Sequence, residues 1–167
     1  LFAHDGHLTL PEVYSATEID AIGHCIDSFS ERQSDKARSK DLHAIRRVLQ
    51  EIPALTAMLF TARLKSVIDT FAAPSSFLTK SIYFDKPPGS NWFVAWHQDI
   101  SISVTARHDT PGYAQWTHKQ GVVGVVPPID ILQNTLTVRI HLDDTDANNG
   151  ALRVVQGSHL EGIVRKE

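Results

Sequence analysis

The spacing of apolar residues changes near Pro74, and this change constrains the fold more than any other feature of the sequence. Before Pro74, apolar side chains recur every three or four residues, which is typical of amphipathic helices. After Pro74, apolar and polar residues alternate, which is typical of strands with one covered face. A length of 167 residues suits a single domain. We therefore expect one domain over 1–167, with a helical part over 1–74 and a β part over 75–167.

Several helices are expected before Pro74. Ser15 and Glu18 have the spacing of a capping box, and apolar residues follow them at helical intervals. Pro53 suits the first position of a later helix. The expected segments are a helix over 16–30, a charged loop over 31–41, a short helix over 42–49, and a helical stripe from 53 that ends near 72–74.

Four strands are expected after Pro74, separated by turns rich in Pro, Gly and Asn. They cover 77–84, 92–100 with an extension over 101–104, 135–143, and 151–155. Residues 105–133 are polar and interrupted by proline-containing turns, so we expect a long loop of the kind that covers a binding site. Arg139 and His141 fall on the polar face of the third strand, which either meets solvent or lines a wet cavity.

Composition argues against several classes of function. The net charge is −3 and the basic residues form no stripe, so nothing indicates a nucleic-acid or membrane partner. A single cysteine, Cys25, excludes an internal disulfide and fits the cytoplasm. The chain begins with Leu1 and stops soon after an expected strand and turn, so we expect a fragment that lacks its C-terminal strands.

His97 and Asp99 are the candidate metal ligands. On a strand, residues two positions apart point to the same side, so the imidazole and the carboxylate would be presented together. They would supply two of the three ligands of the 2-His-1-carboxylate triad, which holds non-haem Fe(II) and leaves sites open for a 2-oxo acid and O2. A surface histidine beside a surface aspartate would have the same spacing. The neighbouring Trp92, Phe93 and Trp96 favour the metal-binding interpretation.

Four short motifs follow one another along the β part. They are Lys-Pro-Pro-Gly at 86–89, His-Gln-Asp at 97–99, Asn-Asn-Gly at 148–150 and Gly-Ser-His at 157–159. In this combination the chain closely resembles the phytanoyl-CoA dioxygenase family, especially its bacterial branch, over essentially its whole length. The resemblance implies a mainly β fold with N-terminal helices, namely a double-stranded β-helix or jelly roll, incomplete at the C-terminus.

The resemblance also implies an enzyme. Fe(II) held by His97 and Asp99 would hydroxylate an aliphatic C–H group of a small organic substrate, while 2-oxoglutarate and O2 become succinate and CO2. The implied cosubstrate-binding residues are Arg139, Gln98, Lys80 and Ile82. Tyr113 and Trp116 of the 105–133 loop would cover the substrate. No catalytic residue is expected beyond the metal ligands.

The family's third iron ligand, a distal histidine, is expected beyond residue 167, as is an arginine for the far carboxylate of 2-oxoglutarate. The chain alone is therefore expected to be inactive. His159 is an alternative third ligand. Two other functions remain open: a non-catalytic jelly-roll binding protein, and a cupin-like metal enzyme, for which no extra ligand is evident near His97. Neither the substrate nor the oligomeric state follows from the sequence.

Overall fold

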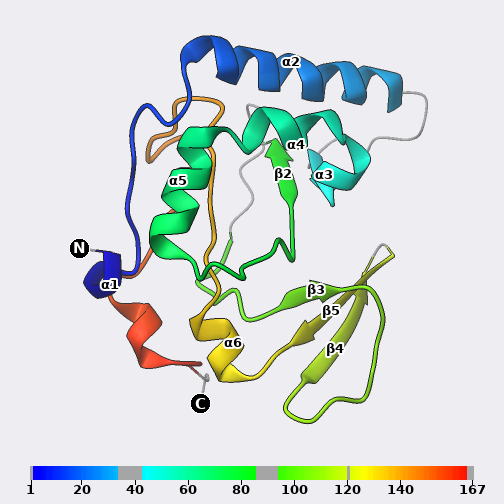
Figure 1. Ribbon diagram of the computed structural model, residues 1–167, viewed down its shortest axis with the longest axis vertical. Helices are drawn as coiled ribbons and strands as arrows, with labels where there is room; N and C mark the ends of the chain where they lie inside the picture. Colours follow the sequence, from blue (N-terminus) through cyan, green and yellow to red (C-terminus); the bar gives the residue numbers. More distant parts are fainter. Residues whose placement is uncertain (1, 34–42, 86–93, 120, 165–167) are drawn as a thin grey trace.

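A computed structural model describes residues 2–33, 43–85, 94–119 and 121–164 (Figure 1). The helices are α1 (Phe2–Asp5), α2 (Ala16–Gln33), α3 (Val48–Glu51), α4 (Ala54–Leu59), α5 (Ala62–Phe71), α6 (Ile129–Gln133) and the 3-10 helix η1 (Ser158–Glu161). The strands are β1 (His43–Arg46), β2 (Ile82–Asp85), β3 (Ile102–Val104), β4 (Ala114–Lys119) and β5 (Val122–Val126). In Figure 1, α2 lies across one end of the molecule, α3–α5 lie beneath it, and the β3–β5 sheet lies toward the opposite end.

The capping box sets the start of α2. The Ser15 hydroxyl accepts from the N–H of Glu18 at 3.3 Å, and the N–H of Ser15 donates to Glu18 Oε2 at 2.7 Å. Arg63 of α5 also binds Oε2 and donates from Nε to the Val13 carbonyl at 2.7 Å, so this helix end is tied to α5. The predicted helix over 16–30 is confirmed and continues through the first residues of the expected loop. The rest of that loop, 34–41, lies outside the described residues.

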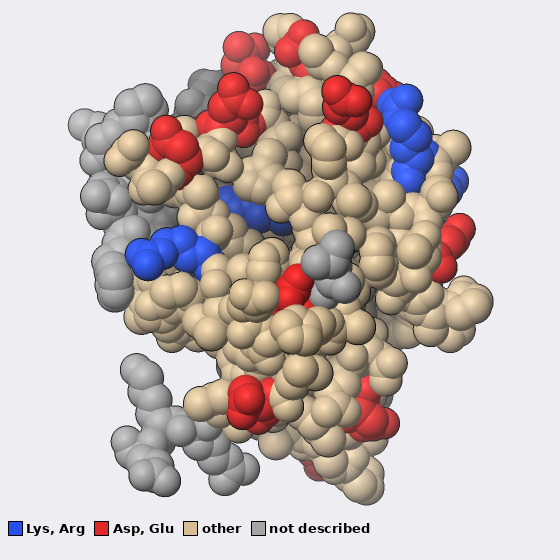
Figure 2. All heavy atoms as spheres, turned by 90° about the vertical axis from the view of Figure 1, so that its left-hand side faces the viewer, with Lys and Arg blue, Asp and Glu red and all other residues tan. Residues whose placement is uncertain are grey.

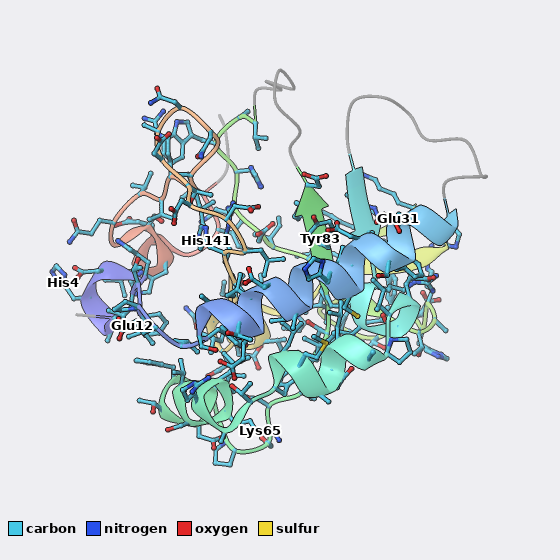
Figure 3. The ribbon with its side chains drawn as sticks, turned by 90° about the horizontal axis from the view of Figure 1, so that it is seen from above. His4, Glu12, Glu31, Lys65, Tyr83 and His141 are labelled. Atoms are coloured by element: carbon cyan, nitrogen blue, oxygen red, sulfur yellow. The ribbon has the colours of Figure 1, made fainter. Side chains whose placement is uncertain are left out.

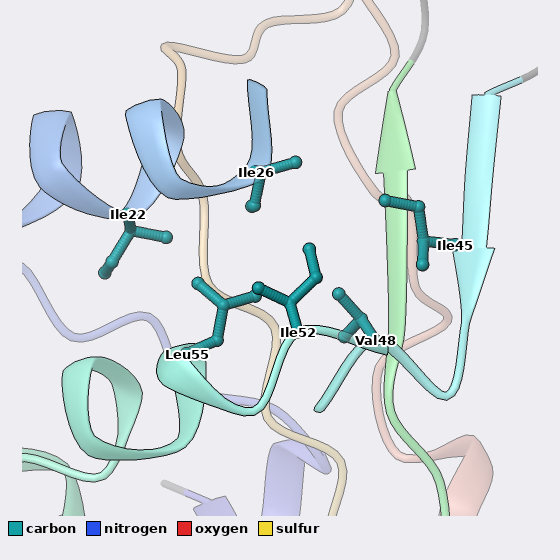
Figure 4. Packing of buried hydrophobic residues seen from close by; sticks show 6 residues of the cluster. All are labelled: Ile22, Ile26, Ile45, Val48, Ile52 and Leu55. Atoms are coloured by element: carbon teal, nitrogen blue, oxygen red, sulfur yellow. The ribbon is translucent and has the colours of Figure 1, made fainter. Parts of the chain in front are cut away.

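An apolar cluster joins α2 to the elements beneath it (Figure 4). Its buried members are Ile22, Ile26, Ile45, Val48, Ile52 and Leu55. Ile22 and Ile26 stand one helical turn apart, so α2 presents both to the cluster. Tyr83 of β2 packs against the same cluster, and Figure 3 shows it close to α2. Burial, together with nearby aspartates, raises the pKa of Tyr83 to about 12, which keeps its phenol neutral.

The predicted short helix over 42–49 is wrong in its first part. His43–Arg46 form β1 instead, which pairs antiparallel with β2. Arg47 then adopts a left-handed conformation, with φ of 56°, and α3 begins at the next residue. Ile45 is buried in the cluster and lies opposite Tyr83 in the ladder. Strand pairing and burial thus outweighed the helical spacing of the apolar residues.

The expected helical stripe from 53 to 71 is divided into α4 and α5. Pro53 is the residue that precedes α4, close to its expected position at a helix start. The division falls at Thr61, whose side chain accepts a hydrogen bond from the N–H of Leu64 at 3.2 Å and caps α5. An unrecognised N-cap therefore explains the difference.

Residues 105–133, expected as a long loop, contain β4, β5 and α6, so that prediction is wrong. β5 pairs antiparallel with β3 on one side and β4 on the other. Four valines favour a strand in β5, and Gly121, with φ of 73°, precedes it at the hairpin turn. The proline-containing turns at 111–112 and 127–128 flank this hairpin in the sequence and meet at its open end, next to the pair formed by Ala114 and Val126. β3 agrees with the expected extension over 101–104.

Thr117 and Gly124 are direct partners across β4 and β5. A Cβ atom at 124 would lie 2.7 Å from the Oγ1 of Thr117, so the threonine side chain occupies the space that a second side chain would need. A side chain at 124 would therefore require the Thr117 side chain to shift. The register shifts between Ala114 and Thr117, where Gln115 has a positive φ of 51°, as in a β-bulge.

The other expected strands are absent as ladders. The expected strand over 77–84 is confirmed only at its end, where 82–84 belong to β2. The segments at 77–81, 94–100, 135–143 and 151–155 have no strand hydrogen-bonded beside them within the described residues, and 92–93 lie outside those residues. Alternating polarity shows which side chains share a face of an extended segment. A sheet also requires a second strand whose backbone hydrogen-bonds to that segment, and alternation does not show whether one is present. The described residues form helices and two small antiparallel sheets, so neither a mainly β content nor a closed jelly roll is seen in them.

Alternation describes burial over 135–143 except at Val138, which belongs to the apolar face but is exposed. Leu136, Ile140 and Leu142 are half-buried, whereas Arg139 and His141 are exposed. Leu142 packs against the apolar cluster, so this extended segment is held by side chains on one face. The polar face meets solvent in this structure.

Helix α1 lies beside η1, and this contact brings the two ends of the described chain together (Figure 1). The N–H of Gly157 donates to the carbonyl of Asp5 at 3.0 Å, and Gln156 Nε2 donates to Asp5 Oδ1 at 2.6 Å. His159 Nε2 donates to the carbonyl of Ala3 at 3.1 Å. Within the described ranges, none of the helices has both the length and the apolar character needed to cross a bilayer.

Leu55→Ala is expected to destabilise the fold by about 2–5 kcal/mol, because it leaves a cavity in the cluster where Leu55 is almost fully buried. Urea unfolding would measure the change. Leu160→Ala on exposed η1 is the control and should stay within about 0.5 kcal/mol of the parent. Equal effects of the two substitutions would contradict the assignment of the cluster as the core.

Glu18→Ala is expected to lower the Tm at pH 7, and this difference should shrink as the pH falls below 4.5. Hydrogen bonds from the backbone and then the side chain of Ser15 lower the pKa of Glu18 from its ordinary 4.5. A carboxyl whose folded pKa is lowered stabilises the fold above its unfolded pKa, and this stabilisation is lost as the pH falls through the folded pKa. Thermal unfolding at several pH values tests this, with Glu161→Ala as the control. A difference that does not change with pH would refute it.

Candidate functional site

His97 and Asp99 lie together on an extended segment, 94–100, that belongs to no strand. The Nε2 of His97 is 3.9 Å from the Oδ1 of Asp99. Their side chains are 61% and 80% exposed, so the nitrogen and the oxygen that could bind a metal are both open to solvent. The structure brings these two residues together, although without the strand that the sequence suggested.

A backbone hydrogen bond fixes which nitrogen of His97 carries the proton. Nδ1 lies 2.8 Å from the carbonyl oxygen of Ala95. A carbonyl oxygen only accepts hydrogen bonds, so Nδ1 must donate. In the neutral ring, Nε2 then carries the lone pair, and it is Nε2 that faces the carboxylate of Asp99. Metal-binding histidines have this arrangement, because the bond at the second nitrogen sets the tautomer and the ring orientation.

The spacing of the two donors suits a shared metal after a small adjustment. Two ligand atoms that occupy neighbouring positions around one metal ion, each with a bond of about 2.1 Å, lie about 3.0 Å from each other. The observed 3.9 Å is therefore about 1 Å longer than a bound pair requires. Rotation of the exposed Asp99 side chain can close this gap while His97 keeps its hydrogen bond to Ala95, so the imidazole nitrogen and the carboxylate oxygen fit two ligand positions of Fe(II).

Gln98, between the two candidate ligands, makes two backbone contacts. Its Nε2 donates to the carbonyl of Gly162 at 2.7 Å, and its Oε1 accepts from the N–H of Val164 at 2.8 Å. The sequence placed Gln98 in the cosubstrate pocket, but both polar atoms of its amide already have partners in the segment 162–164. Nothing in the sequence pattern indicated this partner segment.

Trp96 precedes the pair and contacts a second distant residue. The guanidinium carbon of Arg153 lies 5.4 Å from the centroid of the Trp96 ring, within the range of a cation–π contact. The sequence left the direction of Arg153 undecided. An arginine 57 residues after a tryptophan carries no pattern from which this contact could have been foreseen.

The other candidate cosubstrate residues are dispersed. Arg139 lies exposed on the extended segment after α6. Lys80 Nζ donates to the carbonyl of Ser101 at 3.1 Å, and Ile82 begins β2, half-buried. Among the described residues, no hydrogen bond or ion pair joins Arg139 or Lys80 to His97 or Asp99. His141, on the same face as Arg139, has its Nδ1 3.0 Å from Thr145 Oγ1.

Tyr113 and Trp116 line an open hollow of about 320 Å³. The remaining lining residues are Asp109, Thr110 and Pro111. Arg107 stands over the Trp116 ring, 5.6 Å from its centroid, and lies 3.8 Å from Asp109 Oδ1. The two residues expected to cover the substrate thus share one hollow, but no residue of 94–100 lines it.

The part of the chain that the structure describes contains no set of three His, Cys, Asp or Glu residues arranged to hold a metal ion. His159, the alternative third ligand, uses its Nε2 to bind the backbone of α1, and its ring lies against Gly6. His97 and Asp99 therefore remain two candidate ligands, and the described residues place no third candidate with them. On the face drawn in Figure 2, acidic side chains are scattered and basic ones are well separated, so that face carries no basic stripe.

Comparison with known proteins identifies the family. The family model of phytanoyl-CoA dioxygenase (PhyH) matches residues 2–167, which includes every motif described above. No curated protein and no solved structure gives a significant match. Because the match covers nearly all of the sequence, the chain belongs to the phytanoyl-CoA dioxygenase family.

Proposed function

We propose that the protein is an Fe(II)- and 2-oxoglutarate-dependent dioxygenase that hydroxylates an aliphatic C–H group of a small organic molecule, with His97 and Asp99 as iron ligands. Family membership supports an oxygenase. One observation carries the assignment of the ligands: His97 Nδ1 donates to the backbone carbonyl of Ala95, so that in the neutral ring the lone pair is on Nε2, the nitrogen that faces the Asp99 carboxylate. A cation between these two donors would satisfy both.

Bound iron would use O2 to convert 2-oxoglutarate into succinate and CO2, with transfer of one oxygen atom to the substrate C–H bond. The chain supplies the ligands and their orientation. His97 contributes a neutral nitrogen and Asp99 a negative oxygen, and three protein ligands in all would leave positions open for the cosubstrate and O2. The third ligand is assigned to a residue outside those that the structure describes.

Arg139 is proposed to bind a carboxylate of 2-oxoglutarate. It is exposed, so its guanidinium is free to form the paired hydrogen bonds that a planar carboxylate accepts. Lys80 is a second candidate cation and Ile82 a candidate apolar wall for the same pocket. Tyr113 and Trp116 are proposed to contact the substrate from their hollow. The proposal includes the double-stranded β-helix of the family as the architecture of the whole domain.

A non-catalytic binding protein with the same fold is the second candidate. It is favoured by the absence of a complete metal triad among the described residues and by the exposure of His97 and Asp99. Turnover of 2-oxoglutarate in the absence of any substrate separates the two candidates, because that reaction requires bound iron and cosubstrate but no knowledge of the substrate.

In the full-length protein, which includes the third ligand, His97→Ala and Asp99→Ala are each expected to weaken Mn(II) binding at least tenfold and to abolish iron-dependent release of succinate from 2-oxoglutarate, because each removes a metal ligand. Mn(II) titration followed by electron paramagnetic resonance and a succinate assay measure the two effects. His108→Ala, in the exposed segment between β3 and β4, is the control. Unchanged Mn(II) affinity in His97→Ala, with no succinate from the parent, would establish the non-catalytic alternative.

Arg139→Ala is expected to raise the KM for 2-oxoglutarate about tenfold to a hundredfold, the effect of losing one charge-assisted carboxylate contact of about 1.5–3 kcal/mol. Mn(II) affinity should be unchanged, since Arg139 is not a ligand. Lys65→Ala on α5 is the control for loss of one exposed cation (Figure 3). A KM equal to that of the parent would remove Arg139 from the cosubstrate site.

A further inference from the structure

The segment that carries His97 and Asp99 is held by its side chains. Residues 94–100 have no ladder partner among the described residues, yet Trp96 and Gln98 each contact the part of the chain between 153 and 164. These two residues alternate with the two candidate ligands. Trp96 and Gln98 therefore attach the segment to the rest of the chain, while His97 and Asp99, at the intervening positions, form the candidate metal pair.

The Gln98 amide takes the place of a peptide group in a ladder. In a parallel pair of strands, one residue donates to the carbonyl before its partner residue and accepts from the N–H after it. Gln98 makes the same two bonds with its side chain, to the carbonyl of Gly162 and the N–H of Val164, which flank Ile163. The contact joins positions 64 and 66 residues apart and attaches directly between the two candidate ligands.

Gln98 is consequently poorly suited to the cosubstrate role that the sequence suggested. Both polar atoms of its amide have backbone partners at ordinary hydrogen-bond distances, 2.7 and 2.8 Å. Contact with 2-oxoglutarate would compete with these bonds. The cation–π contact of Arg153 with Trp96 attaches the segment a second time, immediately before His97.

We propose that Gln98 is a positioning residue for the metal pair, and that the affinity of His97 and Asp99 for a metal depends on the attachment of Gln98 to 162–164. This inference rests on the proposed function, because it concerns the same pair of ligands. Residues that orient metal ligands without touching the metal typically change metal affinity about tenfold to a hundredfold when they are replaced. The attachment fixes the backbone on either side of Gln98, which carries His97 and Asp99.

Two substitutions test the proposal. Gln98→Met keeps the length of the side chain and removes both hydrogen bonds, whereas Gln98→Ala also removes its bulk. Both are expected to weaken Mn(II) binding about tenfold to a hundredfold. The visible absorption of bound Co(II), which reports the ligand geometry directly, should change in both, with circular dichroism and Tm close to those of the parent.

Gln156→Ala is the matched control. It removes another side-chain amide that joins distant parts of the chain, but its partner is Asp5 in α1. Its Mn(II) affinity and Co(II) spectrum should equal those of the parent. A loss of Mn(II) affinity in Gln156→Ala as large as in Gln98→Met would assign the effect to general loosening and overturn the proposal.

The outcomes for Gln98→Met and His97→Ala separate the two proposals. If His97→Ala loses Mn(II) affinity while Gln98→Met keeps it, the ligand assignment holds and Gln98 is not a positioning residue. If Gln98→Met raises only the KM for 2-oxoglutarate, Gln98 binds cosubstrate and the inference fails. If His97→Ala also binds Mn(II) like the parent, the ligand assignment fails and the inference falls with it.

Discussion

The fold depends first on the burial of the α2 stripe. Ile22 and Ile26 have little stabilising effect unless water is removed from them, and Leu55 of α4 and Ile45 of β1 provide the covering surface. The same burial brings β1 to β2, whose Tyr83 packs against the cluster. One apolar contact region thus explains both the helical layer and the small sheet beside it. The capping box and the Arg63 contact then fix where α2 begins.

The later part of the described chain is held differently. Val125 is buried in the β3–β5 sheet, but many apolar side chains beyond residue 75 are more than half exposed, including Phe77, Leu152 and Val155. The candidate metal pair lies in this part, on a segment without a ladder. Its geometry therefore depends on a few directional contacts, chiefly those of Gln98 and Trp96, and less on close packing. Local polar contacts of this kind open at lower free energy than a packed core.

The sequence predicted those features that are encoded locally. The start of α2 follows from Ser15 and Glu18, and the proximity of His97 and Asp99 follows from their spacing. Features that depend on distant partners were missed: β1 forms because it pairs with β2, and residues 105–133 form a hairpin although prolines flank it. The alternation over 135–143 separated half-buried from exposed side chains except at Val138, which is exposed, and it could not show whether another strand lies alongside. The partners of Gln98 and Trp96 were unpredictable for the same reason, because nothing in the local pattern identifies residues 162–164 or Arg153.

The close approach of Thr117 to Gly124 has a consequence for the evolution of this sheet. The Thr117 hydroxyl occupies the space beside Gly124 on the neighbouring strand, where a side chain at 124 would otherwise lie. In relatives that keep this hairpin, a larger residue at 124 is accommodated either by a shift of the Thr117 side chain or by a smaller residue at 117. The two positions should therefore covary.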